Sequence, residues 1–296
     1  MRAAGDGGVE FPIPDEALRT RLVELAREKP RFGYRRLQVL LERGGVRVNH
    51  KRVHRVYREA GLAIRRKKRK HCQREGKPLV ERTAANQEWG LDFVHDAVQC
   101  GRAIRVLSVV DAYTRECLAL EVDTSFASRR VTRVLEQIVA ERGVPQAIRS
   151  DNGPEFTSRH FLAWCVERGI ELVHIQPGKP TQNAYVESFN GRLREECLNV
   201  SWFQNLFDAR WKIAAWRREY NEERPHSSLG YRTPEEFARE MGGEKGYGKA
   251  APGKTKSRFS PPLGNPAEGA GFPLSHSPGG DGICANEAVS NPDVVL

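Results

Sequence analysis

The chain has 296 residues, a formal net charge of +10 and 39% hydrophobic residues, enough for one domain of ordinary size and a smaller module. No run approaches the roughly 18 consecutive apolar residues of a membrane span, and the N-terminus lacks the layout of a signal peptide. The positive charge lies at one end, because residues 1–80 hold 22 Lys and Arg against 9 Asp and Glu. A basic end of this kind favours a polyanionic partner, most often nucleic acid.

Residues 15–62 predict a compact module of three short helices, preceded by a flexible N-terminus over residues 1–14. Asp15 is expected to cap the first helix and Asn49 the third, because both residue types accept hydrogen bonds from free backbone N–H groups. Pro30 and Gly44-Gly45 are expected to end the first two helices. The pattern is typical of a helix-turn-helix-like module.

The third of these helices carries several cations that are candidate DNA contacts: Lys51, Arg52 and Arg55. The alternative is a small bundle with a solvated basic face. His50 and His54 are spaced like the histidines of a zinc-binding integrase N-terminus, but no C-x2-C pair accompanies them, so zinc is not expected.

Residues 63–87 form a basic linker between this module and the rest of the chain. Its centre is a run of six cations, which repel one another too strongly to fold alone. Each phosphate that the run contacts adds affinity through counterion release, without adding sequence preference. The DNA-contacting candidates here are Arg65, Arg66, Lys67, Lys68, Arg69 and Lys70. The alternative is a solubilising hinge.

Residues 88–240 change to alternating strand and helix patterns, which predict an α/β domain with a mixed sheet and flanking helices. Strands are expected at 89–94, 104–110, 118–122, 147–150 and 171–175, and helices at 128–142, 158–168, 181–197 and 208–220. This is the element order of the ribonuclease H fold. Residues 241–296 are rich in Gly, Pro and Ser and are expected to form a disordered tail.

Three carboxylates in this domain are the candidate catalytic and metal-binding residues. Asp92 stands inside an apolar strand, Asp151 follows a short strand, and Glu187 lies inside a helix. A charge in a half-buried strand is costly unless it is paired or binds a cation. Mg²⁺ prefers oxygen ligands, and two such ions suit phosphodiester chemistry. We therefore expect a Mg²⁺ site, with Mn²⁺ as a substitute.

The segments around these acids make the pattern more specific. Between Asp151 and Glu187 lie 35 residues, and Arg194 follows seven residues after the glutamate, almost on the same helix face. The strings RSDNGPEFTS, QPGKPTQNAYVESFNGRLREECLN and YNEERPHSSLGYRTPEEF accompany them. Together they resemble the downstream-frame transposase of the third insertion-sequence family, which has a retroviral-integrase-type DDE core. The resemblance covers residues 15–240.

This resemblance implies a DDE transposase, which cleaves DNA and transfers the strand in transposition and integration of an insertion sequence. It implies Asp92, Asp151 and Glu187 as metal ligands and Arg194 as a DNA contact near the scissile phosphate. Asn152, Asn183 and Asn190, with Gly153, match motif positions and are interpreted as DNA-facing or site-shaping. The implied partners are DNA (element ends and target), further copies of the chain, and an upstream-frame helix-turn-helix protein. The implied location is the bacterial cytoplasm at the nucleoid, with no membrane partner.

Two other functions remain open at the level of sequence. A non-catalytic DNA-binding protein would carry a broken triad, and here all three acids are present. A ribonuclease H-like nuclease would cut DNA without joining it, and the basic module together with Arg194 argues against it.

Several nearby residues are interpreted as structural. Asp96 and Asp111 are acids close to Asp92 in the chain; Asp111 is expected to cap or to pair with Arg115, and Glu155 to serve the turn after Asp151. His226 matches the resemblance, and a structural role is favoured over a role in the site. The tryptophans at 202, 211 and 216 are interpreted as packing residues.

Overall fold

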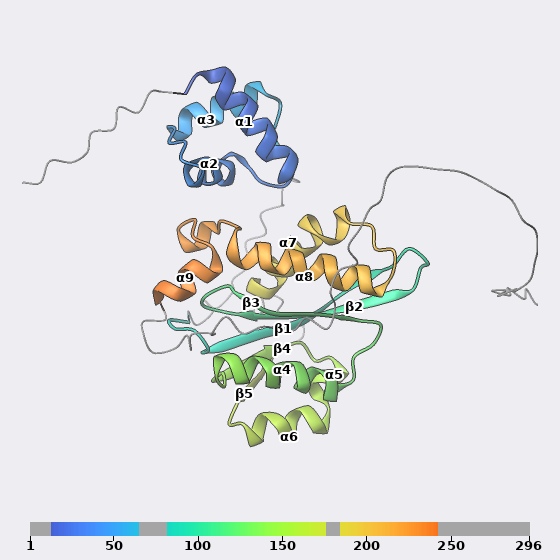
Figure 1. Ribbon diagram of the computed structural model, residues 1–296. Coiled ribbons are helices and arrows are strands. Elements are labelled where there is room, and N and C mark those ends of the chain that lie inside the picture. Colours follow the sequence, from blue (N-terminus) through green and yellow to red (C-terminus); the bar gives the residue numbers. More distant parts are fainter. Residues whose placement is uncertain (1–12, 65–81, 176–183, 242–296) are drawn as a thin grey trace, which may run out of the picture. The chain divides into compact units, whose positions relative to one another are not determined.

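The computed structural model describes residues 13–64, 82–175 and 184–241. Figure 1 shows its helices and strands. The expected tail over residues 241–296 lies outside this part of the chain, except for Met241, and so does the N-terminal segment up to residue 12. No helix in the described residues is long and apolar enough to cross a membrane.

The N-terminal module consists of three helices, α1 (Asp15–Glu28), α2 (Tyr34–Arg43) and α3 (His50–Glu59). Their apolar faces form one small core that includes Leu18, Leu22, Leu37, Leu41 and Val53. The module is therefore the all-α, helix-turn-helix-like unit that the sequence predicts.

The two predicted helix caps of this module have different outcomes. The Asn49 side chain accepts a hydrogen bond from the Lys51 N–H at 2.9 Å, so it caps α3 as predicted. The prediction for Asp15 is wrong, because Pro14 occupies the N-cap position of α1 and no side chain caps that helix. The Asp15 carboxylate lies one residue further on, where it pairs instead with Arg52 and Arg55 of α3.

The second domain is built on a five-stranded sheet in the order β3-β2-β1-β4-β5. The strands are β1 (Glu88–Ala97), β2 (Ala103–Asp111), β3 (Cys117–Asp123), β4 (Ala147–Ser150) and β5 (Glu171–His174). The first three pair antiparallel, whereas β4 runs parallel to both β1 and β5. This mixed sheet is the ribonuclease H-like arrangement that the order of elements predicts.

Helices cover both faces of the sheet (Figure 1). One face carries α4 (Ser128–Arg142), α5 (Pro154–Thr157) and α6 (Arg159–Glu167); the other carries α7 (Ala184–Glu196), α8 (Leu206–Glu222) and α9 (Pro234–Met241). Each face has its own core: Trp89 and Leu91 of β1 pack toward the α4 side, whereas Val94 packs toward α7 and α8. The alternation follows from the period of two in a strand, and it decides which residues of β1 meet α7.

Candidate active site

The pairing of β1 with β4 brings Asp92 and Asp151 to the same level of the sheet. Gly90 is the partner of Arg149 in this parallel pair. The same register, continued two residues further, sets Asp151 beside Asp92 just beyond the end of β4. Neighbouring residues of parallel strands point to the same face. Both carboxylates therefore belong to the face that α7 covers.

Helix α7 approaches this face closely because β1 has a glycine there. A Cβ at Gly90 would lie 2.2 Å from Val186 Cγ2 and 2.6 Å from the Tyr185 hydroxyl oxygen. Only a residue without a side chain allows this spacing. The close approach brings the exposed Glu187 and the half-buried Asn190 of α7 to the side of Asp92.

A direct hydrogen bond fixes the contact between β1 and α7. Asn190 donates from Nδ2 to Asp92 Oδ2 at 2.8 Å, and the Phe93 N–H donates to Asp92 Oδ1 at 2.8 Å. The Asn190 Oδ1 atom is buried and has no hydrogen-bond partner among the described residues. A buried amide oxygen with an open lone pair is a place for a donor such as water.

A hollow of about 300 Å³ opens beside this contact. Its lining includes Asp92, His95, Glu187, Asn190 and Arg194. The exposed Arg194 side chain donates to the backbone carbonyl of His95 at 3.3 Å. The helix therefore presents Glu187 and Arg194 to one hollow, as their seven-residue spacing predicts.

Electrostatics links all three predicted ligands. Burial raises the pKa of Asp92, and the negative charges of Asp151 and Glu187 raise it further, against the hydrogen bonds from Phe93 and Asn190. Like charges held at one place favour a bound cation. In the described part of the chain, however, no three His, Cys, Asp or Glu side chains lie close enough together to hold one metal ion.

An ion pair that the sequence does not reveal supports the same strand. Glu155, expected to serve only the turn, accepts a hydrogen bond from Arg105 of β2 at 2.5 Å. The Arg105 guanidinium carbon lies 4.0 Å from the centroid of the Phe93 ring, next to Asp92 in the chain. Arg105 is the register partner of His95, so only the strand pairing brings these residues together.

Asp111, another acid near Asp92 in the chain, has a structural role. Asp111 is buried; its Oδ1 accepts from the Tyr113 and Thr114 N–H groups, and its Oδ2 accepts from the Asn86 N–H. It therefore caps the turn, and no ion pair joins it to Arg115 among the described residues. Asp96 accepts from the Ala97 N–H.

The asparagines of the matching strings are only partly described. The exposed Asn152 donates to the Ile175 carbonyl at 3.3 Å. The backbone N–H of Gly153 donates to Asp151 Oδ1 at 3.1 Å, which orients that carboxylate. Asn183 lies outside the described residues.

The interpretation of the tryptophans is wrong for two of the three. Trp216 is buried on α8 with Tyr220, but Trp202 and Trp211 are 70% and 64% exposed. Five residues on a helix correspond to an offset of about 140°, so Trp211 cannot share the buried face of Trp216.

On the helical module, the predicted DNA contacts lie on the side of α3 that faces away from its core. Lys51 and Arg55 are exposed and Arg52 is half-buried. Arg52 and Arg55 both pair with Asp15, each at 2.6 Å. Such exposed pairs stabilise a fold weakly and can exchange for phosphate. The cations of the basic linker, residues 65–70, lie outside the described part of the chain.

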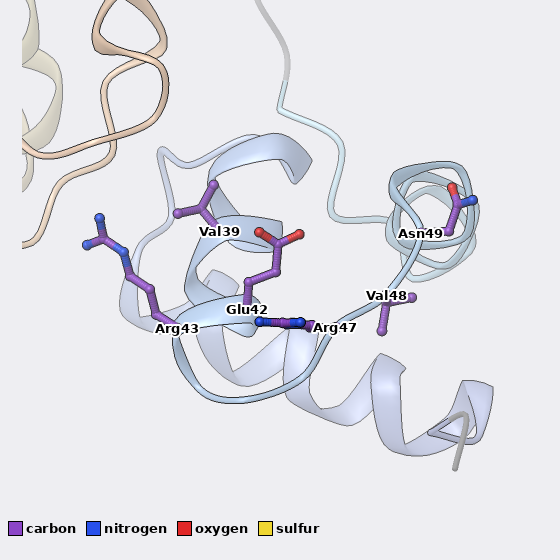
Figure 2. Close-up of a pocket in the computed structure, with 6 residues that line it drawn as sticks. All are labelled: Val39, Glu42, Arg43, Arg47, Val48 and Asn49. Carbon is purple, nitrogen blue, oxygen red and sulfur yellow. The ribbon is translucent and has the colours of Figure 1, made fainter. Parts of the chain in front are cut away.

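A shallow hollow of about 680 Å³ lies at the turn between α2 and α3. Figure 2 shows Arg43 and Arg47 along the end of α2 and the following turn, with Asn49 at the start of α3. The turn thus adds two cations next to the exposed end of α3.

The sequence families match the same two parts of the chain. Integrase core domains match residues 82–180 and 168–234, and an HTH-like domain matches residues 14–70. The chain is 52% identical, over 76% of its length and 81% of the relative, to an uncharacterized 31.7 kDa protein of insertion element IS407 from Burkholderia multivorans. It is 50% identical to an uncharacterized 39.2 kDa protein of insertion element IS476 from Xanthomonas euvesicatoria, over 77% of this chain and 67% of that protein. It is 29% identical to the transposase InsD of insertion element IS2 from Escherichia coli, over 79% and 82%.

Proposed function

Because the chain belongs to the insertion-element transposases of the third insertion-sequence family, with an integrase-type core, we propose that it cleaves and joins DNA in a Mg²⁺-dependent reaction. Asp92, Asp151 and Glu187 are the proposed metal ligands. The observation that carries the assignment is that the β1–β4 register sets Asp151 beside Asp92, while Glu187 of α7 lines the same hollow as Asp92. The three acids come from β1, the end of β4 and α7, and Asp92 is the one that neighbours both of the others.

The donor set fits Mg²⁺, with Mn²⁺ as its substitute. All three side chains offer hard oxygen ligands, and Mg²⁺ is commonly held by one or two carboxylates together with waters and substrate phosphates. Two neighbouring carboxylates, such as those of Asp92 and Asp151, would therefore be enough to bind the ion before the DNA phosphate adds its own oxygen atoms. The buried Asn190 Oδ1 without a partner is a further acceptor beside that pair. Bound metal supplies Lewis acidity for in-line displacement at phosphorus.

The protein's own groups position the reactants. Asn190 holds the Asp92 carboxylate in one orientation, and the Gly153 N–H does the same for Asp151. Arg194 adds a positive charge at the rim of the hollow, where a scissile phosphate needs charge neutralisation. The cations of α3 and the basic linker bind the DNA backbone without reading sequence themselves.

The partners follow from the same family membership. The substrates are the ends of the element and a target DNA, and the chain works as a homo-oligomer on that DNA in the bacterial cytoplasm at the nucleoid. An upstream-frame helix-turn-helix protein assists in finding the element ends.

A joining assay with Mg²⁺ and a DNA end carrying a free 3′-hydroxyl tests the proposal. We expect Asp151→Asn to lose strand transfer by several orders of magnitude while it retains DNA binding. The matched control is Glu167→Gln, an exposed acid of α6, which removes the same charge away from the site. Unchanged joining by Asp151→Asn would refute the assignment of the triad. Cleavage without joining by the wild-type protein would favour the nuclease alternative.

A further inference from the structure

A second polar cavity lies at the other side of α7. Its volume is about 640 Å³, and it opens between the start of α7, the turn after β2 and the turn that contains His226. The arginines that the second domain contributes to its lining are Arg82, Arg115, Arg192 and Arg224, of which Arg224 is paired with Glu196 at 2.7 Å. Among the described residues of its lining, Glu88 carries the sole negative charge. We call this cavity the arginine pocket.

The single acid is already engaged by more than one cation. Glu88 is 3% exposed and accepts two hydrogen bonds of 2.8 Å from Arg149 and one of 2.5 Å from Arg82. The Tyr185 hydroxyl donates to it as well, at 3.0 Å. One carboxylate therefore serves two guanidinium groups, and it leaves an excess of positive charge at this wall of the pocket.

The positive charge of Arg115 is not balanced by an acid of the pocket. It has no carboxylate partner among the described residues, and its guanidinium carbon lies 5.5 Å from the centroid of the Tyr185 ring. In the described part of the chain, Arg192 pairs with the exposed Glu195 three residues away, at 3.1 Å. Exposed pairs of this kind are weak and exchange readily.

The backbone of Arg115 has a strained conformation. Its φ is +62°, a conformation that side chains other than Gly, Asn and Asp rarely adopt. The Asp111 carboxylate fixes the turn through the N–H groups of Tyr113 and Thr114. Backbone strain that the surroundings hold fixed is often found at ligand-binding positions.

The buried His226, which also lines the pocket, has a pKa that responds to these positive charges. Burial, together with the charges of arginines that include Arg224, Arg115 and Arg192, lowers its pKa to about 2. An anion in the pocket would offset these positive charges.

We propose that the arginine pocket binds a backbone phosphate of DNA, at a position away from the scissile phosphate. Ser188 and Arg192 lie four residues apart on the pocket side of α7, whereas Glu187, Asn190 and Arg194 face the hollow at Asp92. A helix with its side chains is only about 10–12 Å across. One DNA molecule can therefore contact both sides of α7. The choice of DNA as the occupant rests on the proposed function, while the site for a phosphate group does not.

The test compares Arg115→Gln with Arg133→Gln in the full chain, without divalent metal, by fluorescence anisotropy on a labelled DNA duplex over a salt series. Arg133 is an exposed arginine of α4, on the other face of the sheet, so it is a matched control for the loss of charge. We expect Arg115→Gln to weaken binding several-fold and to reduce the slope of log affinity against log salt by about 0.9. Arg133→Gln should keep the wild-type slope.

A second measurement separates DNA from a free anion. The His226 ring signals in NMR should shift when duplex DNA is added to the wild-type protein, and Arg115→Gln should reduce that shift. Equal salt slopes for the two variants would overturn the proposal. A shift with inorganic phosphate alone, but none with DNA, would assign the pocket to a free anion and would also overturn it. Because no metal is present, the result does not depend on whether the triad proves catalytic.

Discussion

The hydrogen bond of 2.8 Å from Asn190 Nδ2 to Asp92 Oδ2 joins the covering helix α7 to the central strand β1 at the candidate site. It leaves the Asn190 amide oxygen buried and without a partner among the described residues. One side chain thus orients a proposed ligand on one side and offers an open acceptor on the other.

We predict that Asn190→Ala lowers strand transfer by about 10–100-fold, the usual effect of removing a group that orients a metal ligand. The Mg²⁺ concentration for half-maximal joining should rise at the same time, because Asp92 loses its fixed orientation. The control is Asn199→Ala, an exposed asparagine outside the hollow. An unchanged Mg²⁺ dependence in the Asn190 variant would show that the hydrogen bond serves packing alone.

Gly90 should be intolerant of any side chain. We expect Gly90→Ala to reduce the free energy of unfolding by about 1–3 kcal/mol, the usual cost of overpacking, because the new Cβ meets Val186 Cγ2 at 2.2 Å. Gly191→Ala provides the contrast: nothing lies within 4 Å of its added Cβ. In a helix interior this second change should stabilise the protein by up to about 1 kcal/mol. Denaturant unfolding of both variants checks the pair, and equal stabilities would contradict close packing at Gly90.

Metal binding should be visible in thermal unfolding. We expect Mg²⁺ to raise the Tm of the wild-type protein but not that of Asp92→Asn, since a ligand that binds only the folded state stabilises it. Without metal, the same variant should unfold at a higher temperature than wild type at neutral pH, because it loses a half-buried charge facing Asp151 and Glu187. Asp96→Asn, four residues along β1, should keep the wild-type response. Loss of the Mg²⁺ response in the Asp96 variant instead would exchange the roles of the two acids.

The Glu88 cluster should make stability depend on pH. Although burial opposes it, hydrogen bonds from Arg149, Arg82 and Tyr185 lower the pKa of Glu88 below its usual 4.5. A lowered carboxyl pKa stabilises the fold above the unfolded-state value, and this contribution disappears as the pH falls through the lower folded-state value. Glu88→Gln should therefore cost about 3–5 kcal/mol at pH 7, because it leaves buried arginines without their partner. The difference from wild type should shrink below about pH 4. Denaturant unfolding at several pH values measures it, and a difference independent of pH would mean that packing rather than charge is lost.

Much of the sheet and its helices could be predicted from sequence because local patterns carry them. The helix over Ser128–Arg142 and the strand over Ala147–Ser150 agree with prediction to the residue. At the ends of both elements the pattern of apolar and polar residues in the sequence changes abruptly. The short helix α5 and the C-terminal α9 were not predicted, and they span only four and eight residues.

Part of the candidate site could likewise be predicted from the sequence, and part could not. Spacing and flanking strings point to Asp92, Asp151 and Glu187, and their roles stay predictions. The pairing of Arg105 with Glu155 and the arginine pocket could not be predicted, because each joins residues that are distant in sequence and meet only through strand register and helix packing. The Asp15 cap failed for a related reason: two arginines of α3 compete for that carboxylate.

The register of the four-residue strand β4 also restricts how this chain can change in length. Asp151 follows β4 directly, so one residue inserted or deleted within β4 would turn the Asp151 carboxylate to the opposite face of the sheet. The hairpin connection between β1 and β2, from Val98 to Arg102, contains none of the proposed metal ligands, so a change in its length leaves their register unchanged. Length variation among active copies of such elements should therefore gather in the hairpin connection and be absent between Ala147 and Asp151.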